Sequence, residues 1–343
     1  MKALLLEEYN KLVYKDVPDP EIDNNEVLVK VMACGICGSD VHGLDGSTGR
    51  RIPPMIMGHE ASGVIVKTGS DVRGWKPGDR VTFDSTVYPL NDWFTLEGMY
   101  NLSDNREVLG VSPGSYKRDG AFAEYIAIPQ HILYKIPEKV TFEQAAMVEA
   151  LAVALHSINI SAIKTGDKCV VVGTGMIGIS ILKLLKLSGS SIVIAVDINE
   201  NRLKQALKAG ADHAFLSADV NLMEKINALT NSRGADISFE AAGKSESVNI
   251  AIDAVRKGGK AVLVGNISAK IDFPLQKVVT RELKILGSCA IRGEYDVVLD
   301  LLDSGKLTVD DQISAVAPLS EGAAWFNKLY KKEEELNKII LKP

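Results

Sequence analysis

A short stretch near the N-terminus holds side chains that could bind a metal ion. Cys37, Asp40 and His42 lie in ACGICGSDVHG, and His59 and Glu60 follow in PPMIMGHEASG. Cysteine, histidine and glutamate are the ligand types of a catalytic zinc that keeps one coordination position open. The spacing therefore predicts a zinc site that performs chemistry on a small molecule.

The segments around this stretch predict a β-rich domain. Residues 1–32 alternate apolar and polar side chains between Pro and Asn turn signals, which indicates short strands. Ala33–Gly43 holds three glycines and is expected to form a tight, irregular loop. Ile56–Lys67 is again strand-like, and the turn Lys76–Arg80 leads into another strand. Short strands with Gly and Pro turns favour a mostly β, barrel-like domain.

A glutamate inside a predicted helix is a further metal-ligand candidate. The apolar spacing of Phe142–Ile158 predicts a helix whose N-terminus Thr141 can cap. Glu149 lies inside it, between apolar neighbours. This carboxylate either faces solvent or is held for a metal or a charge, and the residues alone favour neither interpretation.

The middle of the chain contains a dinucleotide-binding pattern. The β-branched run Lys168–Val172 leads directly into Gly173-Thr174-Gly175-Met176-Ile177-Gly178, a predicted helix follows, and the next predicted strand ends at Asp197. Glycines between a strand and a helix allow a tight turn and close approach of a pyrophosphate, with an acid about 20 residues on for the ribose. A carboxylate there repels a 2′-phosphate, so NAD is favoured over NADP. The alternative is a glycine-rich turn without a ligand.

Strands and helices then alternate along the chain, which predicts a parallel, doubly wound α/β sheet. The ligand is expected beyond the carboxyl ends of its strands, near Gly265, Asn266 and Gly287–Cys289. Tyr295–Ser304 and Glu321–Lys332 are predicted helices, and a last strand, Lys338–Leu341, is expected to return to the first domain.

Composition excludes several classes of protein. The chain has 343 residues, a length that suits two domains, and 46% of them are hydrophobic, as in ordinary proteins with a large core. The net charge of −5 argues against nucleic-acid binding. No apolar run approaches the roughly 18 residues of a membrane span, and MKALLLEEYN does not resemble a signal peptide. Four cysteines are too few for a disulfide scaffold, so a cytoplasmic setting is expected.

Nearly the whole chain resembles the zinc-dependent medium-chain dehydrogenase/reductase family, most closely its sorbitol, polyol and galactitol-1-phosphate dehydrogenase branch. The resemblance rests on motifs in a fixed order: GICGSDVHG, GHEASGVIVKTGS, KPGDRV, DGAFAEYIAIP, AAMVEALAVALHSI, VVVGTGMIGI and RELKILGS. It implies a GroES-like catalytic domain over residues 1–152 and 290–343, and a Rossmann NAD-binding domain over 153–289.

The resemblance also implies roles for individual side chains. Cys37, His59 and Glu149 match zinc ligands, and Glu60 matches a carboxylate that binds the metal directly or through water. Asp40 matches the acid that orients the ligand histidine. Two further catalytic positions are implied. Ser39 matches the hydroxyl beside the substrate oxygen, and His42 matches the end of the proton relay. The implied cofactor-binding residues are Gly173, Gly175, Met176, Ile177, Gly178, Asp197, Arg202, Val264, Gly265 and Ser288.

Two cysteine patterns depart from those of the family that the chain resembles. Many relatives bind a structural zinc through four cysteines in the lobe over residues 84–120. The matching positions here are Pro89, Asp92, Thr95 and Ser103. We therefore expect one zinc per chain and a lobe packed by apolar side chains, namely Leu90, Trp93, Phe94 and Tyr100. Cys34 matches no ligand position, so its CxxC spacing with Cys37 is interpreted as incidental, against the alternative of a thioredoxin-like redox pair.

The expected reaction is reversible, NAD-dependent oxidation of a secondary alcohol on a polyol or sugar-alcohol phosphate. Arg50 and Arg51 could clamp a phosphate or could be solvated, and Arg292 and Tyr295 could line the substrate pocket. The alternatives are an L-threonine or 2,3-diol dehydrogenase of the same family and, more remotely, a non-catalytic member. The three remaining histidines, His131, His156 and His213, are expected to be packed or on the surface. The resemblance implies a homodimer or homotetramer.

Overall fold

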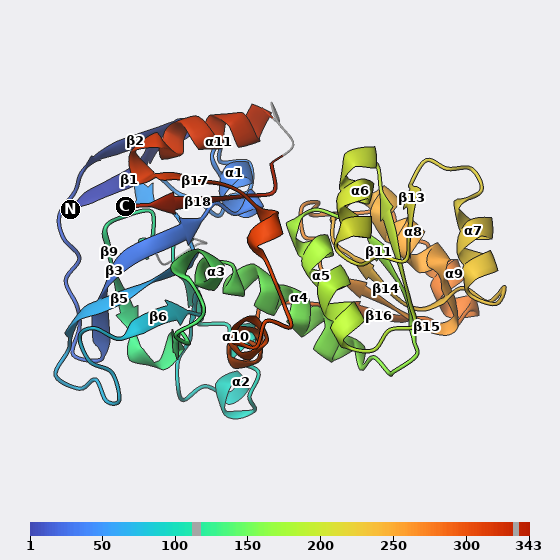
Figure 1. Ribbon diagram of the computed structural model, residues 1–343, viewed down its shortest axis with the longest axis horizontal. Helices are drawn as coiled ribbons and strands as arrows, with labels where there is room; N and C mark the ends of the chain where they lie inside the picture. The colour runs from blue at the N-terminus through green and yellow to red at the C-terminus, as the bar shows by residue number, and fades with distance from the viewer. Residues whose placement is uncertain (112–117, 332–335) are drawn as a thin grey trace. The chain divides into compact units, whose positions relative to one another are not determined.

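A computed structural model describes residues 1–111, 118–331 and 336–343, which divide into two compact units. Unit 1 contains Met1–Glu149 and Ile291–Pro343, and unit 2 contains Ala150–Ala290 (Figure 1). In the described part of the chain, no helix combines the length and the apolar character needed to cross a membrane.

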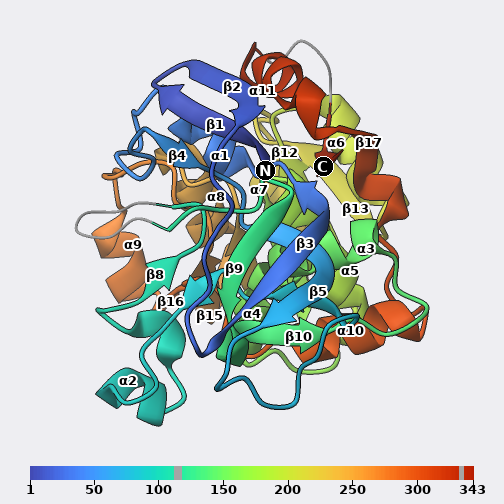
Figure 2. The same ribbon diagram turned by 90° about the vertical axis from the view of Figure 1, so that its left-hand side faces the viewer.

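Unit 1 is built around a curved sheet with strand order β10-β6-β5-β3-β18-β17, in which β9 also pairs with β3. Figure 2 shows β3, β5 and β9 side by side. A second sheet has the order β2-β1-β4, and β7 pairs with β8. The strands are β1 (Lys2–Glu8), β2 (Lys11–Asp16), β3 (Glu26–Gly35), β4 (Met55–Ile56), β5 (Glu60–Thr68), β6 (Arg80–Phe83), β7 (Thr86–Val87), β8 (Glu107–Val108), β9 (Tyr125–Pro129), β10 (Leu133–Lys135), β17 (Ile313–Pro318) and β18 (Lys338–Lys342).

The last strand returns to the first domain, as the sequence predicts, because β18 pairs with the end of β3 through Ile340–Gly35 and Leu341–Cys34. The helices of this unit are α1 (Gly38–Gly43), α2 (Trp93–Leu96), α3 (Phe142–Ala146), α10 (Tyr295–Asp303) and α11 (Gly322–Lys331). Short 3-10 turns lie at Tyr100–Leu102, Gln130–Ile132, Asp310–Gln312 and Leu319–Glu321. The C-terminal end of the predicted helix Glu321–Lys332 lies outside the described residues.

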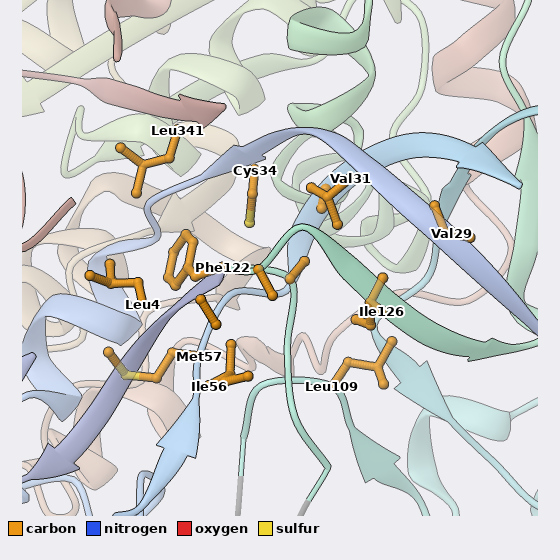
Figure 3. Packing of buried hydrophobic residues seen from close by; sticks show 14 of the residues in the cluster. Leu4, Val29, Val31, Cys34, Ile56, Met57, Leu109, Phe122, Ile126 and Leu341 are labelled. Atoms are coloured by element: carbon orange, nitrogen blue, oxygen red, sulfur yellow. The ribbon is translucent and has the colours of Figure 1, made fainter. Parts of the chain in front are cut away.

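The core of unit 1 contains Cys34. Its side chain is fully buried among apolar groups that include Val31 and Phe122, as Figure 3 shows. Burial raises the pKa of the Cys34 thiol well above its ordinary value, so the thiol stays protonated and unreactive. The interpretation of Cys34 as a core residue, rather than half of a redox pair, fits this environment.

Two local predictions are wrong. The segment Ala33–Gly43 is not an irregular loop, because β3 extends to Gly35 and α1 begins at Gly38. The helix predicted over Phe142–Ile158 is interrupted at Met147, so that α3 is followed by a separate α4 (Val148–Ser161). Thr141 caps α3 as expected and forms a capping box with Gln144.

The lobe over residues 84–120 is stabilised by polar contacts more than by the apolar packing that the sequence predicts. Leu90 and Trp93 are 61% and 63% exposed, so the prediction that they pack the lobe is wrong. Polar contacts replace them: Asp92 accepts a hydrogen bond from the Thr95 N–H at 2.7 Å and also pairs with the Ser103 hydroxyl. Tyr100, which does contribute, donates to Asp84 at 2.9 Å. Residues 112–117 of this lobe lie outside the described residues.

Unit 2 has a parallel sheet with the order β13-β12-β11-β14-β15-β16, the arrangement of a dinucleotide-binding fold. Helices α5 and α6 pack on one side of it, and α7 and α8 on the other (Figure 1). The strands are β11 (Lys168–Val172), β12 (Ile192–Asp197), β13 (His213–Leu216), β14 (Ala235–Glu240), β15 (Val255–Leu263) and β16 (Lys284–Gly287). The helices after α4 are α5 (Met176–Leu187), α6 (Glu200–Lys208), α7 (Leu222–Leu229), α8 (Ser245–Ala254) and α9 (Leu275–Thr280).

Candidate active site

The metal-ligand candidates of unit 1 meet where β3 ends and where α1 and β5 begin. Cys37 is the N-cap residue of α1, His59 immediately precedes β5, and Glu60 begins that strand. One ligand atom from each of the three residues lies within 4.8 Å of the other two. Cys37 remains partly exposed, whereas His59 and Glu60 are buried. The group therefore has one open side.

The imidazole of His59 faces a buried carboxylate at ion-pair distance. Its Nδ1 lies 3.4 Å from Asp40 Oδ1, and Asp40 is fully buried. Burial alone would raise the pKa of Asp40, but His59 and Arg51 outweigh it and lower that pKa, which keeps Asp40 ionised. A carboxylate behind a histidine fixes the ring orientation and tautomer of a metal ligand. Asp40 is thus placed to orient His59.

Glu60 is paired with a buried lysine that sequence reasoning missed. Lys338 Nζ in β18 donates to Glu60 Oε2, and the two side chains are 2% and 1% exposed. Gly35 lies opposite Glu60 in the β3–β5 pair, and a Cβ on Gly35 would lie 2.5 Å from Glu60 Oε2. A side chain at position 35 would therefore displace the Glu60 carboxylate, and the glycine leaves room for it.

Glu149 lies in the first turn of α4 and is not a member of the close group. Burial raises its pKa to about 7, and the neighbouring carboxylate of Glu60 adds to that shift while His59 opposes it. The structure therefore brings Cys37, His59 and Glu60 together, with Glu149 near enough to interact electrostatically with the last two.

The charges of the cluster match a divalent cation. Arg51 pairs with Asp40 and Lys338 pairs with Glu60, so each of these acids has its own base. A Cys37 thiolate, a neutral His59 and an ionised Glu149 then carry a combined charge of about −2. Tetrahedral zinc spaces its ligand atoms about 3.5 Å apart. The ligand atoms of Cys37 and His59 lie within 4.8 Å of each other and need only a small contraction to reach that spacing. The donor set and the charge therefore fit zinc.

Helix α1 presents the two expected relay residues on its exposed face. Ser39 and His42 are three positions apart, so they lie on the same side of the helix, and both are exposed. The Ser39 hydroxyl donates to Cys37 Sγ at 3.2 Å. Ser39 is therefore in direct contact with the metal-ligand group, and His42 lies one turn away from it.

The glycine-rich turn of unit 2 has the conformation that the sequence predicts. Gly173 has φ of +91°, and Gly175 is the N-cap residue of α5. A Cβ on Gly178 would lie 1.9 Å from the Gly173 carbonyl oxygen. Met176 and Ile177 form the first turn of the helix, where free N–H groups and the helix dipole attract phosphate. Arg202 Nη1 is 4.0 Å from the position of a Cβ on Gly175, so a cation lies over the turn.

Asp197 ends β12 and is linked directly to this turn. Its Oδ2 accepts hydrogen bonds from the backbone N–H of Thr174 at 2.6 Å and from the Thr174 hydroxyl at 3.0 Å, and its Oδ1 accepts from the Asn199 N–H at 3.0 Å. A carboxylate has about four acceptor positions, so capacity remains for one ribose hydroxyl. Asp197 therefore supports the turn in addition to its expected role.

The remaining cofactor candidates lie at the carboxyl ends of the neighbouring strands. Val264 and Gly265 follow β15, and both backbone N–H groups donate to the Glu240 carbonyl, at 2.8 and 3.0 Å. Ser288 follows β16, and its buried Oγ has no hydrogen-bond partner among the described residues. These residues line the same end of the sheet as the glycine-rich turn, where ligands bind in folds of this type.

Several sequence interpretations of the substrate pocket are changed by the structure. Tyr295 is fully buried and stacks on Tyr134 at 4.6 Å, so it does not line an open pocket. Arg292 is exposed. Arg51 is 2% exposed and bound to Asp40, so it is neither the solvated arginine nor the phosphate clamp that the sequence suggested. The histidines His131, His156 and His213 are partly or fully buried, and none of them belongs to the metal-ligand group, as expected.

Sequence reasoning missed Lys338 and Thr174 as parts of these sites and gave Arg51 a different role. Lys338 is 278 positions from Glu60, and no local pattern connects the two. Arg51 directly follows Arg50, so the sequence does not show which of the two arginines is buried and which is exposed. Thr174 lies inside the glycine motif. Its polar side chain, in a sequence that also offers Asp197, is the one signal that could have indicated their contact.

Sequence comparisons define the class of protein. The family described as Alcohol dehydrogenase GroES-like domain matches residues 23–138, and the family described as Zinc-binding dehydrogenase matches residues 175–304. The chain is 35% identical to D-xylulose reductase A of Aspergillus oryzae, covering 95% of this chain and 93% of the relative. It is 33% identical to sorbitol dehydrogenase of Bacillus subtilis, covering 92% and 90%. The chain belongs to the zinc-dependent medium-chain dehydrogenase/reductase family, in its polyol dehydrogenase branch.

Solved structures share the fold along the whole chain. Galactitol-1-phosphate dehydrogenase from Escherichia coli has a TM-score of 0.93 at 25% identity, covering 100% of both chains. 2R,3R-butanediol dehydrogenase from Bacillus subtilis has a TM-score of 0.89 at 28% identity, covering 100% of this chain and 99% of its own. A zinc-binding dehydrogenase from Sinorhizobium meliloti 1021, solved bound to NADP, has a TM-score of 0.91 at 30% identity, with coverage of 100% and 99%. The predicted fold class, a Rossmann sheet with a mostly β, GroES-like domain, is confirmed.

Proposed function

We propose that this protein catalyses the reversible, zinc- and NAD-dependent oxidation of a secondary alcohol on a polyol or sugar-alcohol phosphate to the ketone. The observation that carries this proposal is the cluster of Cys37, His59 and Glu60 within 4.8 Å beside an exposed serine, in a chain related to D-xylulose reductase and sorbitol dehydrogenase. The non-catalytic alternative loses weight because each expected ligand and relay position is filled.

The charge balance supports Cys37, His59 and Glu149 as the protein ligands of the zinc. Lys338 neutralises Glu60. Glu60 is therefore a carboxylate that can bind the metal transiently rather than a permanent ligand. A zinc ion supplies Lewis acidity, which lowers the pKa of a hydroxyl group that it polarises. Metal binding would also deprotonate Glu149, whose pKa of about 7 in the metal-free protein reflects burial beside another acid.

The chain's own residues would bind the alcohol and carry its proton. The exposed Ser39 hydroxyl can accept the proton of a substrate hydroxyl as it releases its own proton, and His42 can receive a proton at the solvent end of the same helix face. The turn at Gly173–Gly178 would bind the pyrophosphate of the cofactor that accepts the hydride. Unit 1 thus provides the residues that act on the alcohol, and unit 2 binds the nucleotide.

Asp197 favours NAD, since an ionised carboxylate attracts ribose hydroxyls and repels a 2′-phosphate. We expect Asp197→Asn to lower the ratio of kcat/KM for NAD to kcat/KM for NADP at least about tenfold, because a charge-assisted hydrogen bond contributes about 1.5–3 kcal/mol. Steady-state kinetics with both cofactors measure this ratio. Asp212→Asn, at an exposed ion pair with Lys186 in the same unit, is the control and should leave the ratio unchanged. A wild-type preference for NADP would contradict the assignment.

We expect one zinc per chain. Within the described residues, the cluster of Cys37, His59 and Glu60 is the one group of three or more close candidate ligands, and the lobe is tied by the Asp92–Ser103 contact instead. Metal analysis of clean protein should therefore find about one zinc. Asp92→Ala should leave that zinc content unchanged and should lower the free energy of unfolding slightly through loss of the α2 cap. Two zinc ions per chain would refute this count.

We propose that the protein forms a homodimer or homotetramer. Strand β16 lies at the edge of the unit 2 sheet, and the preceding helix α9 has exposed apolar side chains, with Leu275 at 64% and Val279 at 67%. An open edge next to apolar groups favours pairing with a second copy. Light scattering after size-exclusion chromatography should give two or four times the mass of the 37.0 kDa chain. Leu275→Glu should shift the mass toward the monomer, and a wild-type monomer at micromolar concentration would contradict the proposal.

The direct test of the reaction is a screen at 340 nm of zinc-loaded protein with NAD. The panel contains free polyols, 1-phosphorylated polyols, 2,3-diols and L-threonine. Turnover of one polyol group supports the proposal, and turnover of phosphorylated members alone would define the narrower substrate. Turnover of 2,3-diols or threonine alone would move the protein to the alternative substrate class. No turnover with zinc and NAD both bound would refute the proposed substrate class.

A further inference from the structure

Arg51 is buried in the wall of the metal-ligand group, although its neighbour Arg50 is exposed. Arg51 is 2% exposed, and its guanidinium donates to Asp40 Oδ1 from Nη2 at 2.7 Å and from Nε at 3.3 Å. The same Nη2 donates to Ser39 Oγ at 3.1 Å. One side chain therefore contacts both the acid behind His59 and the serine beside Cys37.

A glycine in α1 leaves space for the Arg51 side chain. Arg51 crosses the last residue of α1, and a Cβ on Gly43 would lie 2.4 Å from Arg51 Cγ and 3.4 Å from its Cβ. Both atoms belong to the base of the side chain, which cannot move away as a flexible tip can. Gly43 thus provides the space through which the guanidinium reaches Asp40 and Ser39.

The contact with Ser39 fixes the direction of the serine hydroxyl. Every N–H of a guanidinium is a donor, so Ser39 Oγ can only accept from Arg51. The hydroxyl proton must then point elsewhere, and it is donated to Cys37 Sγ at 3.2 Å. The contact with Asp40 acts on the other side of the cluster, because the same Oδ1 lies 3.4 Å from His59 Nδ1. A fork-shaped cation can hold two groups in this way, whereas a lysine is a single point charge.

We propose that Arg51 is a positioning residue for the alcohol chemistry: its guanidinium links Asp40 to Ser39, and so orients the metal-ligand histidine and the proton-accepting serine as one unit. The inference rests on the proposed zinc-dependent function, and it assigns to Arg51 a role inside the site in place of phosphate binding. It predicts that metal affinity and turnover depend on the same arginine.

The test compares Arg51→Met, Arg51→Lys and Arg50→Met, each purified, stripped of metal and reloaded. We expect Arg51→Met to weaken zinc binding about 10–100-fold in a chelator competition, as loss of outer contacts to metal ligands does. Its cobalt-substituted form should show altered visible absorption bands. Its kcat for the polyol should fall while the KM for NAD stays the same. Arg51→Lys should recover part of both losses, and Arg50→Met, at an exposed side chain, should match the wild type in zinc affinity and cobalt spectrum.

Two results would overturn the proposal. One is a folded Arg51→Met protein with wild-type zinc affinity and cobalt spectrum. The other is a protein of reduced stability whose kcat and spectrum are unchanged, since that indicates a merely structural arginine. Should Arg51→Met fail to fold, Gly43→Ala replaces it, because its Cβ displaces the arginine stem without removing a charge, and the same losses are expected. If the wild type oxidises no polyol, the proposed function fails, and zinc affinity and the cobalt spectrum still decide the role of Arg51.

Discussion

Replacing Cys37 with alanine is expected to abolish both zinc binding and turnover. The thiolate is one of the two anionic ligands in the charge balance of the site, so its loss leaves a divalent cation undercompensated. We expect zinc content to fall from about one to below about 0.1 per chain. We expect kcat/KM to fall at least roughly 10³-fold, which corresponds to about 4 kcal/mol of transition-state stabilisation. Metal analysis and the assay at 340 nm measure the two losses on the same sample.

Cys34→Ala is the matched control for this experiment. Cys34 lies three positions earlier, is fully buried in the apolar core and contacts the backbone carbonyl of Gly35 through its thiol. Its truncation should lower the free energy of unfolding by about 1–2 kcal/mol and leave zinc content and turnover unchanged. Equal losses in both variants would show that the Cys37 effect is a folding defect, and retained activity in Cys37→Ala would remove Cys37 from the site.

Replacing Lys338 with methionine is expected to destabilise the metal-free protein by about 3–5 kcal/mol. The lysine is paired with Glu60 in the protein interior, and removal of one partner leaves an uncompensated buried charge. Zinc should reduce this loss, because a cation beside Glu60 provides a second partner for the carboxylate. Urea unfolding of the chelated and zinc-loaded forms measures both values.

A matched pair on the same strand provides the control. Lys342 bonds to Glu143 at 2.8 Å, but these side chains are 46% and 25% exposed. Lys342→Met should therefore cost no more than about 1 kcal/mol. The double variant Glu60→Gln, Lys338→Met should recover much of the stability lost in Lys338→Met, because no charge is left unpaired. A cost below about 1 kcal/mol for Lys338→Met in the metal-free protein would contradict the buried-pair account.

The sequence predicts most strongly those features in which residue type and local spacing determine the outcome. The turn at Gly173–Gly178 needs a glycine with positive φ and another that admits the helix, and both occur as predicted. The doubly wound sheet follows from alternating strands and helices, and β18 returns to the first domain as expected. Such features depend on neighbours within a few positions of each other.

The parts that sequence analysis could not predict depend on partners far apart in the chain. Lys338 stabilises Glu60 across 278 positions, and only the fold brings β18 beside β3. The lobe shows a related error, because Trp93 is apolar but exposed, while Asp92 and Ser103 carry the contact. Apolar type alone does not say that a side chain is buried. The same limit applies to Arg50 and Arg51, identical neighbours in opposite environments.

The most direct test of the account is a zinc titration of metal-stripped protein, followed by NADH formation at 340 nm with NAD and the best polyol of the panel. The account predicts no turnover without metal and a linear rise that saturates at about one zinc per chain, with Cys37→Ala inactive at every ratio. Full turnover in the stripped protein would contradict the proposed role of zinc, and saturation only at two zinc ions per chain would contradict the single site.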